Sequence, residues 1–580
     1  MRLGGEQGLK SNRADTAGTL SAAGFLKKGT TDLARVRFTE VLSRKRTRKA
    51  EFFFILILLL LSLTLFFFRL GTRPLWDIDE GMHAATSKEM VLSGDWITPQ
   101  VNGENFYDKP VLFTWFAAIS FLVFGFTEFA ARLPAAMLGL GCVLVTYLFG
   151  RYIFSPAIGF LGAVILATTV EFIILSRVVV HDMSLAFFMT LALFFFYVGF
   201  NRERHRRTYL LLFYASAGFA VLTKGPIGVL LPALIIGLFL MLRGNLAFLK
   251  QMEIGWGILV FLGIAAPWYI LISLENRDYA GYFFIQQNLM NFISLSQEVS
   301  HPRPLYFYVY ILAGGFFPWS LFLPLAIIRA LRGGLKGIGD GTLFLLVWFG
   351  MIFLFFSVAS SKLEPYILPL FPAVSLLVGI LWCELLKAPT HGLRRSFLFS
   401  SIPIPVLFLG GLLYMLVNPP TRSAYEHGID LAHVNYLLFS IAAGATAAFF
   451  LFLGKHYRSF FSMIIGMVVF SMVVTIVLIV PPSNPYRSTK GLARELDMML
   501  PPGEKLVFFD DLRDSALFYT NRRAIVLCYP HQLLDYFASD GRVFCVIDRE
   551  DFEKFESLRH TTYVLGKEGR KLLVSNRRSS

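Results

Sequence analysis

The chain has 580 residues, of which 55% are apolar, 16% aromatic and only 16% charged, and its mean hydropathy is +0.60. A soluble domain carries about a quarter charged residues, so this composition excludes a soluble protein and predicts a polytopic α-helical membrane protein. The net charge of +15 is typical of basic cytoplasmic loops in such proteins. No basic segment is interleaved with aromatic residues as in a nucleic-acid groove, so we expect no nucleic-acid partner.

The N-terminal 50 residues are polar and end in a basic cluster directly before the apolar run 51–70. We expect residues 1–50 to be a flexible cytoplasmic tail. The apolar run is too long for a signal-peptide core, and no small-residue cleavage pattern follows it. It is therefore predicted to be a retained anchor whose N-terminal end faces the cytoplasm, and residues 71–128 then form a first external loop.

Twelve further apolar segments are long enough to cross a bilayer, which predicts about 13 transmembrane helices over residues 51–481. The uncharged stretch 110–127 would only just cross. If it lies along the outer surface, the inner loops between the later spans hold 15 basic residues and the outer connections between the same spans hold six. A full span would invert this balance, so we expect an interfacial helix. The predicted spans after the anchor are 129–152, 156–176, 182–200, 208–223, 225–243, 253–274, 306–330, 341–358, 364–384, 396–417, 434–454 and 459–481.

Beyond a proline-rich break at 481–485 the chain becomes soluble in character. Short apolar runs at 505–510, 524–528 and 543–547 predict buried strands, and they alternate with predicted helices at 488–500 and 531–537. We expect residues 482–580 to form a small α/β domain on the periplasmic side. Its Cys528 and Cys545 would lie in an oxidising compartment, where either a disulfide or two buried thiols is consistent with the sequence.

This topology gathers the ionisable residues near span ends at one membrane face. A secondary transporter would place such groups near mid-depth, on interrupted helices in two related halves, and the sequence shows no internal repeat. The pattern favours an enzyme whose cavity opens to the outer face, and a transporter or flippase of lipid-linked sugars is the alternative. The gathered residues are Asp77, Asp79, Glu80, Lys109, His181, Asp182, Lys224, His301, Arg303, Lys362 and Tyr366.

Seven short motifs follow one another along the segments predicted to lie at the outer face. They are WDIDEGMHA at 76–84, GDWITP at 94–99, DKP at 108–110, RLP at 132–134, HD at 181–182, TKGP at 223–226 and SKLEPYILP at 361–369. With this set, the chain resembles the GT-C glycosyltransferases of the aminoarabinose transferase and protein O-mannosyltransferase superfamily over most of residues 51–481. The resemblance implies a GT-C fold in the bacterial inner membrane. It also implies transfer of a sugar, with inversion, from a polyprenyl-phosphate donor such as undecaprenyl phosphate to lipid A, another glycan or a protein.

The resemblance also implies roles for individual residues. Lys109 matches the family's phosphate-binding lysine, and Asp79 matches the acidic residue beside the acceptor, a general base for a hydroxyl acceptor. Asp182 matches a second family carboxylate, and Glu80 is a further catalytic candidate beside Asp79. Fixed cations can stabilise the charge that grows on the leaving phosphate, so we expect no catalytic metal. The other expected phosphate ligands are Arg303, Lys362, Tyr366 and Lys224.

Each assignment has a structural alternative. Asp79, Glu80 and Asp182 could be acids that cap a helix. Lys109 could be an interfacial lysine whose head reaches water, and Lys224 could simply mark a turn. Asp108 and His301 match positions where some family members hold zinc, so a structural zinc ion there is an open alternative. Asp108 replaces a glutamate, however, and two ligands do not define a zinc site.

Overall fold

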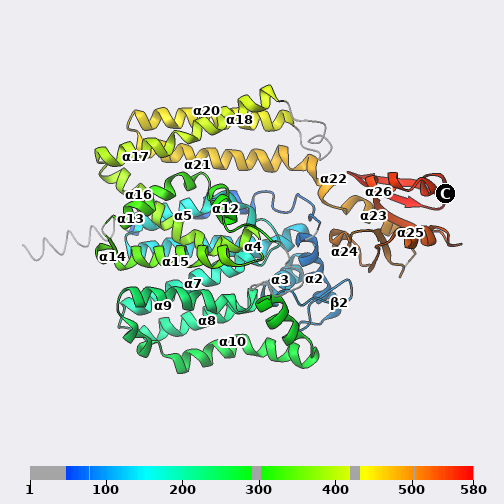
Figure 1. The fold of residues 1–580 in the computed structure, drawn as a ribbon, viewed down its shortest axis with the longest axis horizontal. Coiled ribbons are helices and arrows are strands. Elements are labelled where there is room, and N and C mark those ends of the chain that lie inside the picture. The colour runs from blue at the N-terminus through cyan, green and yellow to red at the C-terminus, as the bar shows by residue number, and fades with distance from the viewer. Residues whose placement is uncertain are drawn as a thin grey trace, which may run out of the picture. The chain divides into compact units, whose positions relative to one another are not determined.

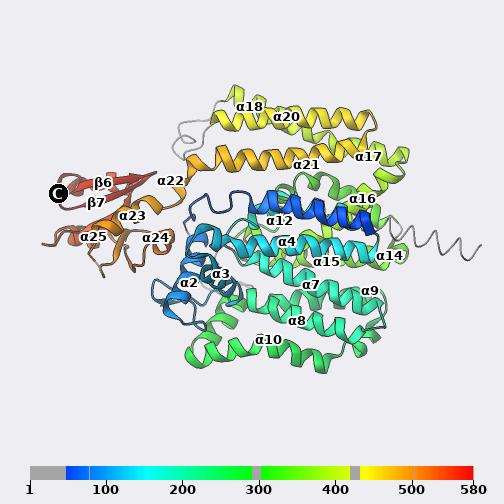
Figure 2. The same ribbon diagram turned by 180° about the vertical axis from the view of Figure 1, so that it is seen from behind.

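The computed structural model describes residues 48–77, 79–290, 302–332, 334–418, 431–501 and 503–578. It consists of two units, residues 1–57 and 58–580, and each is considered by itself. Of the first unit, the structure describes only the start of the helix Arg48–Phe67. The second unit holds the rest of the apolar helices and the C-terminal segment (Figures 1 and 2).

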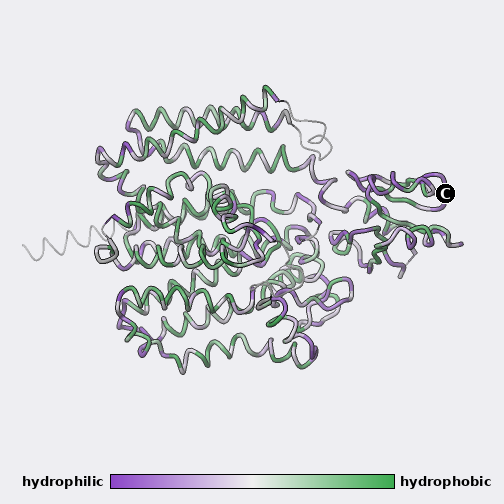
Figure 3. Tube along the Cα trace, in the orientation of Figure 1, coloured by the Kyte–Doolittle hydropathy of each residue, from purple (hydrophilic) through white to green (hydrophobic). Residues whose placement is uncertain are grey.

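Among the described residues, nine helices are long and apolar enough to cross a membrane. Hydrophobic residues run along the bundle helices, and hydrophilic residues gather at their ends and in the C-terminal segment (Figure 3). Five of these spans are single helices: α4 (Glu128–Ile153), α7 (Asp182–Asn201), α10 (Ile254–Glu275), α15 (Asp340–Val358) and α20 (Leu431–Leu453, of which His433–Leu453 is the apolar span). The other four join two elements each. They are Arg48–Phe67, which ends in η1 (Leu63–Phe67); η5 with α16 (Glu364–Leu370 and Phe371–Lys387); α17 with α18 (His391–Ser401 and Pro403–Val417, of which His391–Met415 is the apolar span); and α21 with η6 (Tyr457–Val474 and Thr475–Ile479).

The remaining four of the 13 predicted spans are helical but shorter, broken or less apolar. Segment 156–176 divides into α5 (Pro156–Ala167) and α6 (Val170–Leu175), and segment 306–330 bends by 113° between α12 (Phe307–Gly315) and the pair η4 (Trp319–Phe322) and α13 (Leu323–Leu331). Pro318 at the second break lacks the N–H that would continue the helix. The other two are α8 (Arg206–Lys224) and α9 (Ile227–Leu242).

Small residues let bundle helices approach closely. A Cβ added at Gly150 would lie 2.7 Å from the Cα of Gly159, and one at Gly379 would lie 2.8 Å from the backbone nitrogen of Gly162. Such contacts are how helices pack in a membrane, where no hydrophobic effect drives them together. Three short elements connect bundle helices: η2 (Leu246–Gln251), η3 (Gly281–Met290) and α14 (Gly334–Gly337).

The segment predicted to be the first external loop, named the first external segment below, contains α2 (Asp79–Ser93), the hairpin β1–β2 (Gln100–Val101 and Glu104–Asn105) and α3 (Leu112–Phe124). Helix α3 has 13 residues, and at 1.5 Å per residue it spans roughly 20 Å. A helix of this length is too short to cross a hydrocarbon core of about 30 Å, as expected for an interfacial helix.

The C-terminal segment folds around a five-stranded sheet of order β4-β3-β5-β7-β6. The three predicted strands are β3 (Leu506–Phe509), β4 (Ala524–Leu527) and β5 (Phe544–Asp548), and β3 pairs in parallel with both others. The sequence analysis missed the antiparallel hairpin of β6 (Tyr563–Glu568) and β7 (Lys571–Ser575). The helices are η7 (Pro481–Ser483), α22 (Asn484–Arg487), α23 (Lys490–Met499), α24 (Asp514–Tyr519), α25 (Pro530–Phe537), α26 (Arg549–Lys554) and α27 (Glu556–Thr561).

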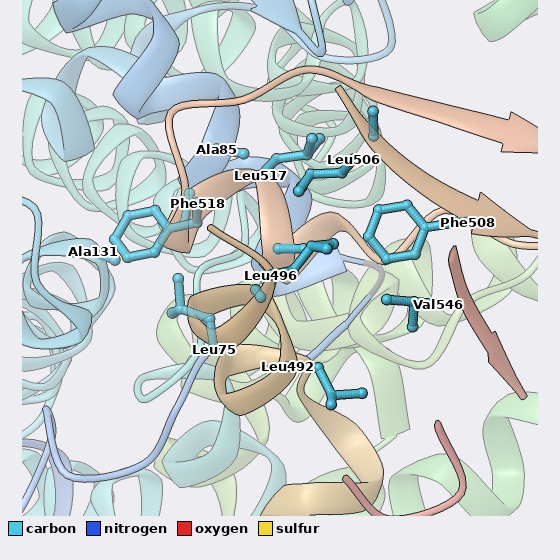
Figure 4. Close-up of a cluster of buried hydrophobic side chains, with 14 of the residues drawn as sticks. Leu75, Ala85, Ala131, Leu492, Leu496, Leu506, Phe508, Leu517, Phe518 and Val546 are labelled. Atoms are coloured by element: carbon cyan, nitrogen blue, oxygen red, sulfur yellow. The ribbon is translucent and has the colours of Figure 1, made fainter. Parts of the chain in front are cut away.

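This C-terminal segment shares one hydrophobic core with the first external segment (Figure 4). Leu75, Ala85 and Phe113 belong to the same buried cluster as Leu496 and Phe508. Helix α2 also docks directly on α24: a Cβ at Gly81 would lie 2.6 Å from the backbone nitrogen of Ser515. Residues 482–580 are therefore fused to the first external segment through a common core.

The four cysteines are free thiols in the described structure. Cys545 is buried on β5 and Cys528 is exposed just after β4, and strand β3 lies between these two strands. The sequence left open whether Cys528 and Cys545 form a disulfide or remain two buried thiols. In the structure both are thiols, and only Cys545 is buried.

Candidate active site

Asp79 and Glu80 begin helix α2 but have different surroundings. Asp79 is exposed, whereas Glu80 is buried. Glu80 accepts hydrogen bonds from Arg132 Nε at 2.7 Å, from Arg73 Nη2 at 3.0 Å and from the Trp76 backbone N–H at 3.1 Å. Its carboxylate thus ties the start of α2 to α4 and to the turn that precedes α2.

The same contacts determine the charge of Glu80. Burial raises the pKa of Glu80, but the charges of Arg132 and Arg73 and the hydrogen bond from Arg132 outweigh burial and lower this pKa to about 2. A carboxylate that is ionised throughout the physiological range and held by two guanidinium groups is poorly suited to proton transfer. We therefore assign Glu80 a structural role in place of the catalytic role expected from the sequence.

Asp77, the first acid of the cluster, contacts the C-terminal segment. Its carboxylate accepts hydrogen bonds from the Ser515 backbone N–H at 3.0 Å and from Thr489 Oγ1 at 2.9 Å, and Lys571 Nζ lies 3.5 Å away. Asp77 thus joins the first external segment to α24 and β7. The three acids of the cluster therefore differ: Asp77 contacts the C-terminal segment, Glu80 is ion-paired with two arginines, and Asp79 is exposed.

Lys109 lies in the loop before α3, close to both carboxylates that the sequence analysis selected. Burial lowers the pKa of the Lys109 ammonium group, and the charge of Lys224 lowers it further. Asp108, Asp182 and Asp79 act in the opposite direction. Asp79 and Lys109 therefore lie within electrostatic range of each other, which is the relationship that the sequence analysis required.

Asp182 and Lys224 form an ion pair between the first residue of α7 and the last residue of α8. The Lys224 Nζ also lies 4.1 Å from the centroid of the Tyr366 ring, a cation–π contact. Lys224 therefore does more than mark the turn at Gly225. Asp182, Lys224 and Tyr366 bring α7, α8 and η5 together beside Lys109.

Lys362 and Arg303 form a separate pair of predicted phosphate ligands. Lys362 is buried, and its Nζ donates to the backbone oxygen of Arg303 at 3.1 Å and to that of Ala359. The Arg303 side chain is exposed and lies 5.7 Å from the Phe307 ring centroid. Lys362 thus holds the backbone that carries Arg303, and the guanidinium group of Arg303 faces solvent.

Two buried histidines pack between these groups. The His83 and His181 rings are 4.5 Å apart, and among the described residues His83 Nδ1 and both ring nitrogens of His181 have no hydrogen-bond partner. Burial and the charge of Lys109 lower the pKa of His83 to about 3. Burial and the neighbouring His83 lower the pKa of His181 well below its ordinary value. Both rings are therefore neutral.

Asp514, the first residue of α24, lies within electrostatic range of Asp77 and Asp79, and the sequence analysis did not select it. Burial and the charge of Asp77 raise the pKa of Asp514 to about 7, and Asp511 and Asp79 contribute further. An acid with a pKa near neutrality can both donate and accept a proton at the working pH. The sequence feature that could have pointed to Asp514 is its position shortly after the carboxyl end of strand β3.

The expected zinc position is only partly described. Asp108 Oδ1 accepts a hydrogen bond from the Tyr282 hydroxyl at 2.8 Å. His301 lies outside the described residues. Within the described ranges no group of three or more metal-ligating side chains is assembled. The zinc site depends on His301 and stays a prediction, and we derive no step through a metal.

Comparison with known proteins decides the family. The family profile of dolichyl-phosphate-mannose-protein mannosyltransferases matches residues 108–271. An undecaprenyl phosphate-α-4-amino-4-deoxy-L-arabinose arabinosyl transferase of Aeromonas salmonicida is 32% identical over 384 residues, which are 63% of this chain and 67% of that protein. The chain belongs to the GT-C glycosyltransferases of the aminoarabinose transferase type. It is thus a multi-pass membrane enzyme of a family that uses polyprenyl-phosphate-linked sugars, as the resemblance implied.

Two further proteins are similar to this chain. An uncharacterized protein of Aquifex aeolicus is 31% identical over 363 residues, 60% of this chain and 70% of its own length. The crystal structure of the transferase ArnT from Cupriavidus metallidurans bound to undecaprenyl phosphate superposes with a TM-score of 0.75 at 23% identity, covering 91% of this chain and 98% of that one. This likeness confirms the GT-C fold, including its small C-terminal sheet.

Proposed function

We propose that this GT-C transferase moves a sugar from a polyprenyl-phosphate carrier to an acceptor at the outer face of the bacterial inner membrane. The observation that carries the proposal is the convergence of Asp79, Lys109 and the Asp182–Lys224 pair within electrostatic range. The naming of several relatives as undecaprenyl-phosphate aminoarabinose transferases supports the choice of donor.

Lys109 is the proposed ligand of the donor phosphate. Its ammonium group is buried among three carboxylates and one other cation, so it presents a fixed positive charge where little water competes for it. When the sugar leaves, negative charge grows on the phosphate, and preorganised cations stabilise that charge in the transition state. Tyr366 and Lys224 lie beside Lys109, and Arg303 is an exposed guanidinium available to the same phosphate.

In this assignment, cationic side chains of the protein neutralise the negative charge of the donor phosphate. We accordingly propose that no metal cofactor takes part in the transfer. Lys362 acts differently from its neighbours in this proposal, because its ammonium group holds the Arg303 backbone. It is a positioning residue for Arg303.

Asp79 is the proposed base. It is the exposed carboxylate of the cluster, and it interacts with Lys109 on the donor side. As an acceptor hydroxyl attacks the anomeric carbon from the face opposite the phosphate, Asp79 takes its proton, and a single displacement inverts the configuration. Asp182, held by Lys224, orients the reacting groups.

The acceptor is proposed to be an envelope molecule: lipid A, another glycan or a protein hydroxyl. Asp514 extends the acidic surface from Asp79 onto α24, so acceptor binding would involve the C-terminal segment. With a phosphate acceptor there is no hydroxyl proton to remove at neutral pH, and Asp79 would orient the acceptor instead. The excess of basic residues in alternate loops supports a cytoplasmic N-terminus and a periplasmic C-terminal segment.

The experiment that tests this function separates transfer from binding. We expect Asp79→Asn in purified full-length protein to abolish sugar transfer from a synthetic polyprenyl-phosphate sugar and to retain polyprenyl-phosphate binding. A transporter or flippase would show no transfer in the unmodified protein either. Turnover by Asp79→Asn at the unmodified rate would remove Asp79 from the mechanism.

A further inference from the structure

A large cavity lies apart from the residues of the proposed active site. Its volume is about 580 Å³, within the range of pockets that take up small-molecule ligands. Its walls come from the turn 69–76, from α6 and from the last bundle helices α18, α20 and α21. None of the proposed phosphate ligands of the sugar donor lines it.

The charged residues that line this cavity are all positive. Three arginines line it, Arg69, Arg73 and Arg177, and none of its described lining residues is acidic. Arg73 is ion-paired with Glu80, and Arg177 donates to the backbone oxygens of Leu65 and Phe68. Arg69 is exposed. Arg73 and Arg177 are therefore held in place, and the three arginines carry more positive charge than Glu80 neutralises.

Away from the arginines the lining is apolar. Helix α21 and its continuation η6 present one face to the cavity, at positions three and four residues apart from Phe460 to Ile476. Helix α20 contributes Ile441, Ala445 and Ala448. Only 6% of the most apolar stretch of the α21 span is buried within the protein. A protein interior is normally filled to crystal density, so an apolar space of this size beside a loosely packed membrane helix is suited to lipid chains.

We propose that this cavity binds an anionic glycerophospholipid of the surrounding bilayer. The phosphate lies among Arg69, Arg73 and Arg177, because guanidinium groups bind phosphate oxygens in a fixed fork geometry. The acyl chains lie along α20 and α21. The lipid is a resident ligand and not the sugar donor.

Trp76 connects this cavity to the active site. Its ring lines the cavity and stacks against Arg73, whose Cζ lies 4.0 Å from the ring centroid. Its backbone N–H donates to Glu80, and its backbone oxygen accepts from the Gly81 N–H at 2.9 Å. A lipid phosphate at Arg73 thus contacts the residues that position the start of α2, which carries Asp79.

The test uses full-length protein purified in mild detergent and mixed with equal amounts of phosphatidylglycerol and phosphatidylcholine that carry identical chains. Native mass spectrometry counts the lipids retained. We expect the unmodified protein to retain phosphatidylglycerol about tenfold over phosphatidylcholine, because the choline cation of phosphatidylcholine offsets the charge of its phosphate and is repelled by the arginines. Arg69→Gln should bring the ratio toward one, and Ala445→Phe, which fills the apolar part, should reduce retention of both lipids.

Two matched variants control for general effects. Arg494→Gln removes an exposed arginine of α23, and Ala447→Phe adds a ring on the exposed face of α20; neither residue lines the cavity. Both should behave like the unmodified protein. Equal retention of the two lipids by the unmodified protein, an unchanged ratio in Arg69→Gln, or a polyprenyl phosphate as the retained species would overturn the proposal.

Discussion

Arg132 donates two hydrogen bonds to Glu80, at 2.7 and 2.9 Å, across the junction between α4 and α2. Arg132 is 1% exposed and Glu80 5%. A buried guanidinium group left without its carboxylate is costly, and without Glu80 the direct partners of Arg132 would be the neutral backbone oxygens of Leu70, Arg73 and Pro74. This pair therefore connects the bundle to the helix that carries Asp79.

Glu80→Gln should destabilise the protein by about 3–5 kcal/mol, the usual cost of breaking a buried ion pair. Thermal unfolding in detergent measures the loss. The matched control is Glu384→Gln, which breaks the more exposed pair with Arg329 and should cost about 0–1 kcal/mol. Unchanged stability of Glu80→Gln with loss of turnover would restore the catalytic role that the sequence suggested.

Lys109→Ala should weaken binding of the donor more than it destabilises the folded protein. A hydrogen bond to a charged group contributes about 1.5–3 kcal/mol, so Kd for polyprenyl phosphate should rise by about 10- to 100-fold. Titration of the lipid against purified protein measures this change. Lys250→Ala, at an exposed lysine of η2, is the control and should leave Kd unaltered. An unchanged Kd for Lys109→Ala contradicts its assignment to the phosphate.

Gly81→Ala should separate α2 from α24. The new Cβ would lie 2.6 Å from the Ser515 nitrogen and 2.9 Å from its Cα, and these backbone atoms cannot yield as a flexible side chain would. We expect a loss of about 1–3 kcal/mol, typical of overpacking, together with faster proteolysis of the C-terminal segment. Gly237→Ala, at a helical glycine of α9 with open space around it, should be neutral in both assays.

Asp514 should make stability depend on pH. An aspartate in the unfolded chain titrates near pH 4, whereas the pKa of folded Asp514 is about 7. Between these values the folded state holds a proton that the unfolded state has released, so stability should fall as pH rises from about 4 to 7 and then level off.

Asp514→Asn should remove this component of the pH dependence. The check is the difference in melting temperature between the two proteins, measured across that pH window. A difference that does not change with pH would show that Asp514 titrates normally.

Much of the bundle was predictable from the sequence, because an apolar run of membrane length has few alternatives. The residues near Lys109 were also predictable, because loop charge assigns a side to Asp79, Asp182 and Lys224. The broken helices were not, because hydropathy does not report where a helix bends. The break after Ala167 and the 113° bend between α12 and the pair η4 and α13 lie inside runs that are predominantly apolar.

The roles within the acidic cluster could not be separated from the sequence either. Asp77, Asp79 and Glu80 are chemically similar, and what distinguishes them is partners far along the chain. Asp77 meets Ser515, 438 residues away, and Glu80 meets Arg132, 52 residues away. Asp514 was missed for a related reason, since two of the carboxylates that act on it, Asp77 and Asp79, come from a segment more than 400 residues away.

The core that residues 75–135 share with residues 492–573 bears on how the enzyme is made. During synthesis the surface formed by Leu75, Ala85 and Phe113 emerges early, and the leucines of α23 that cover it emerge after every membrane helix. The bundle can therefore be inserted before the helix carrying Asp79 has its final support. Truncated chains that end before α23 should consequently reach the membrane and lack transferase activity.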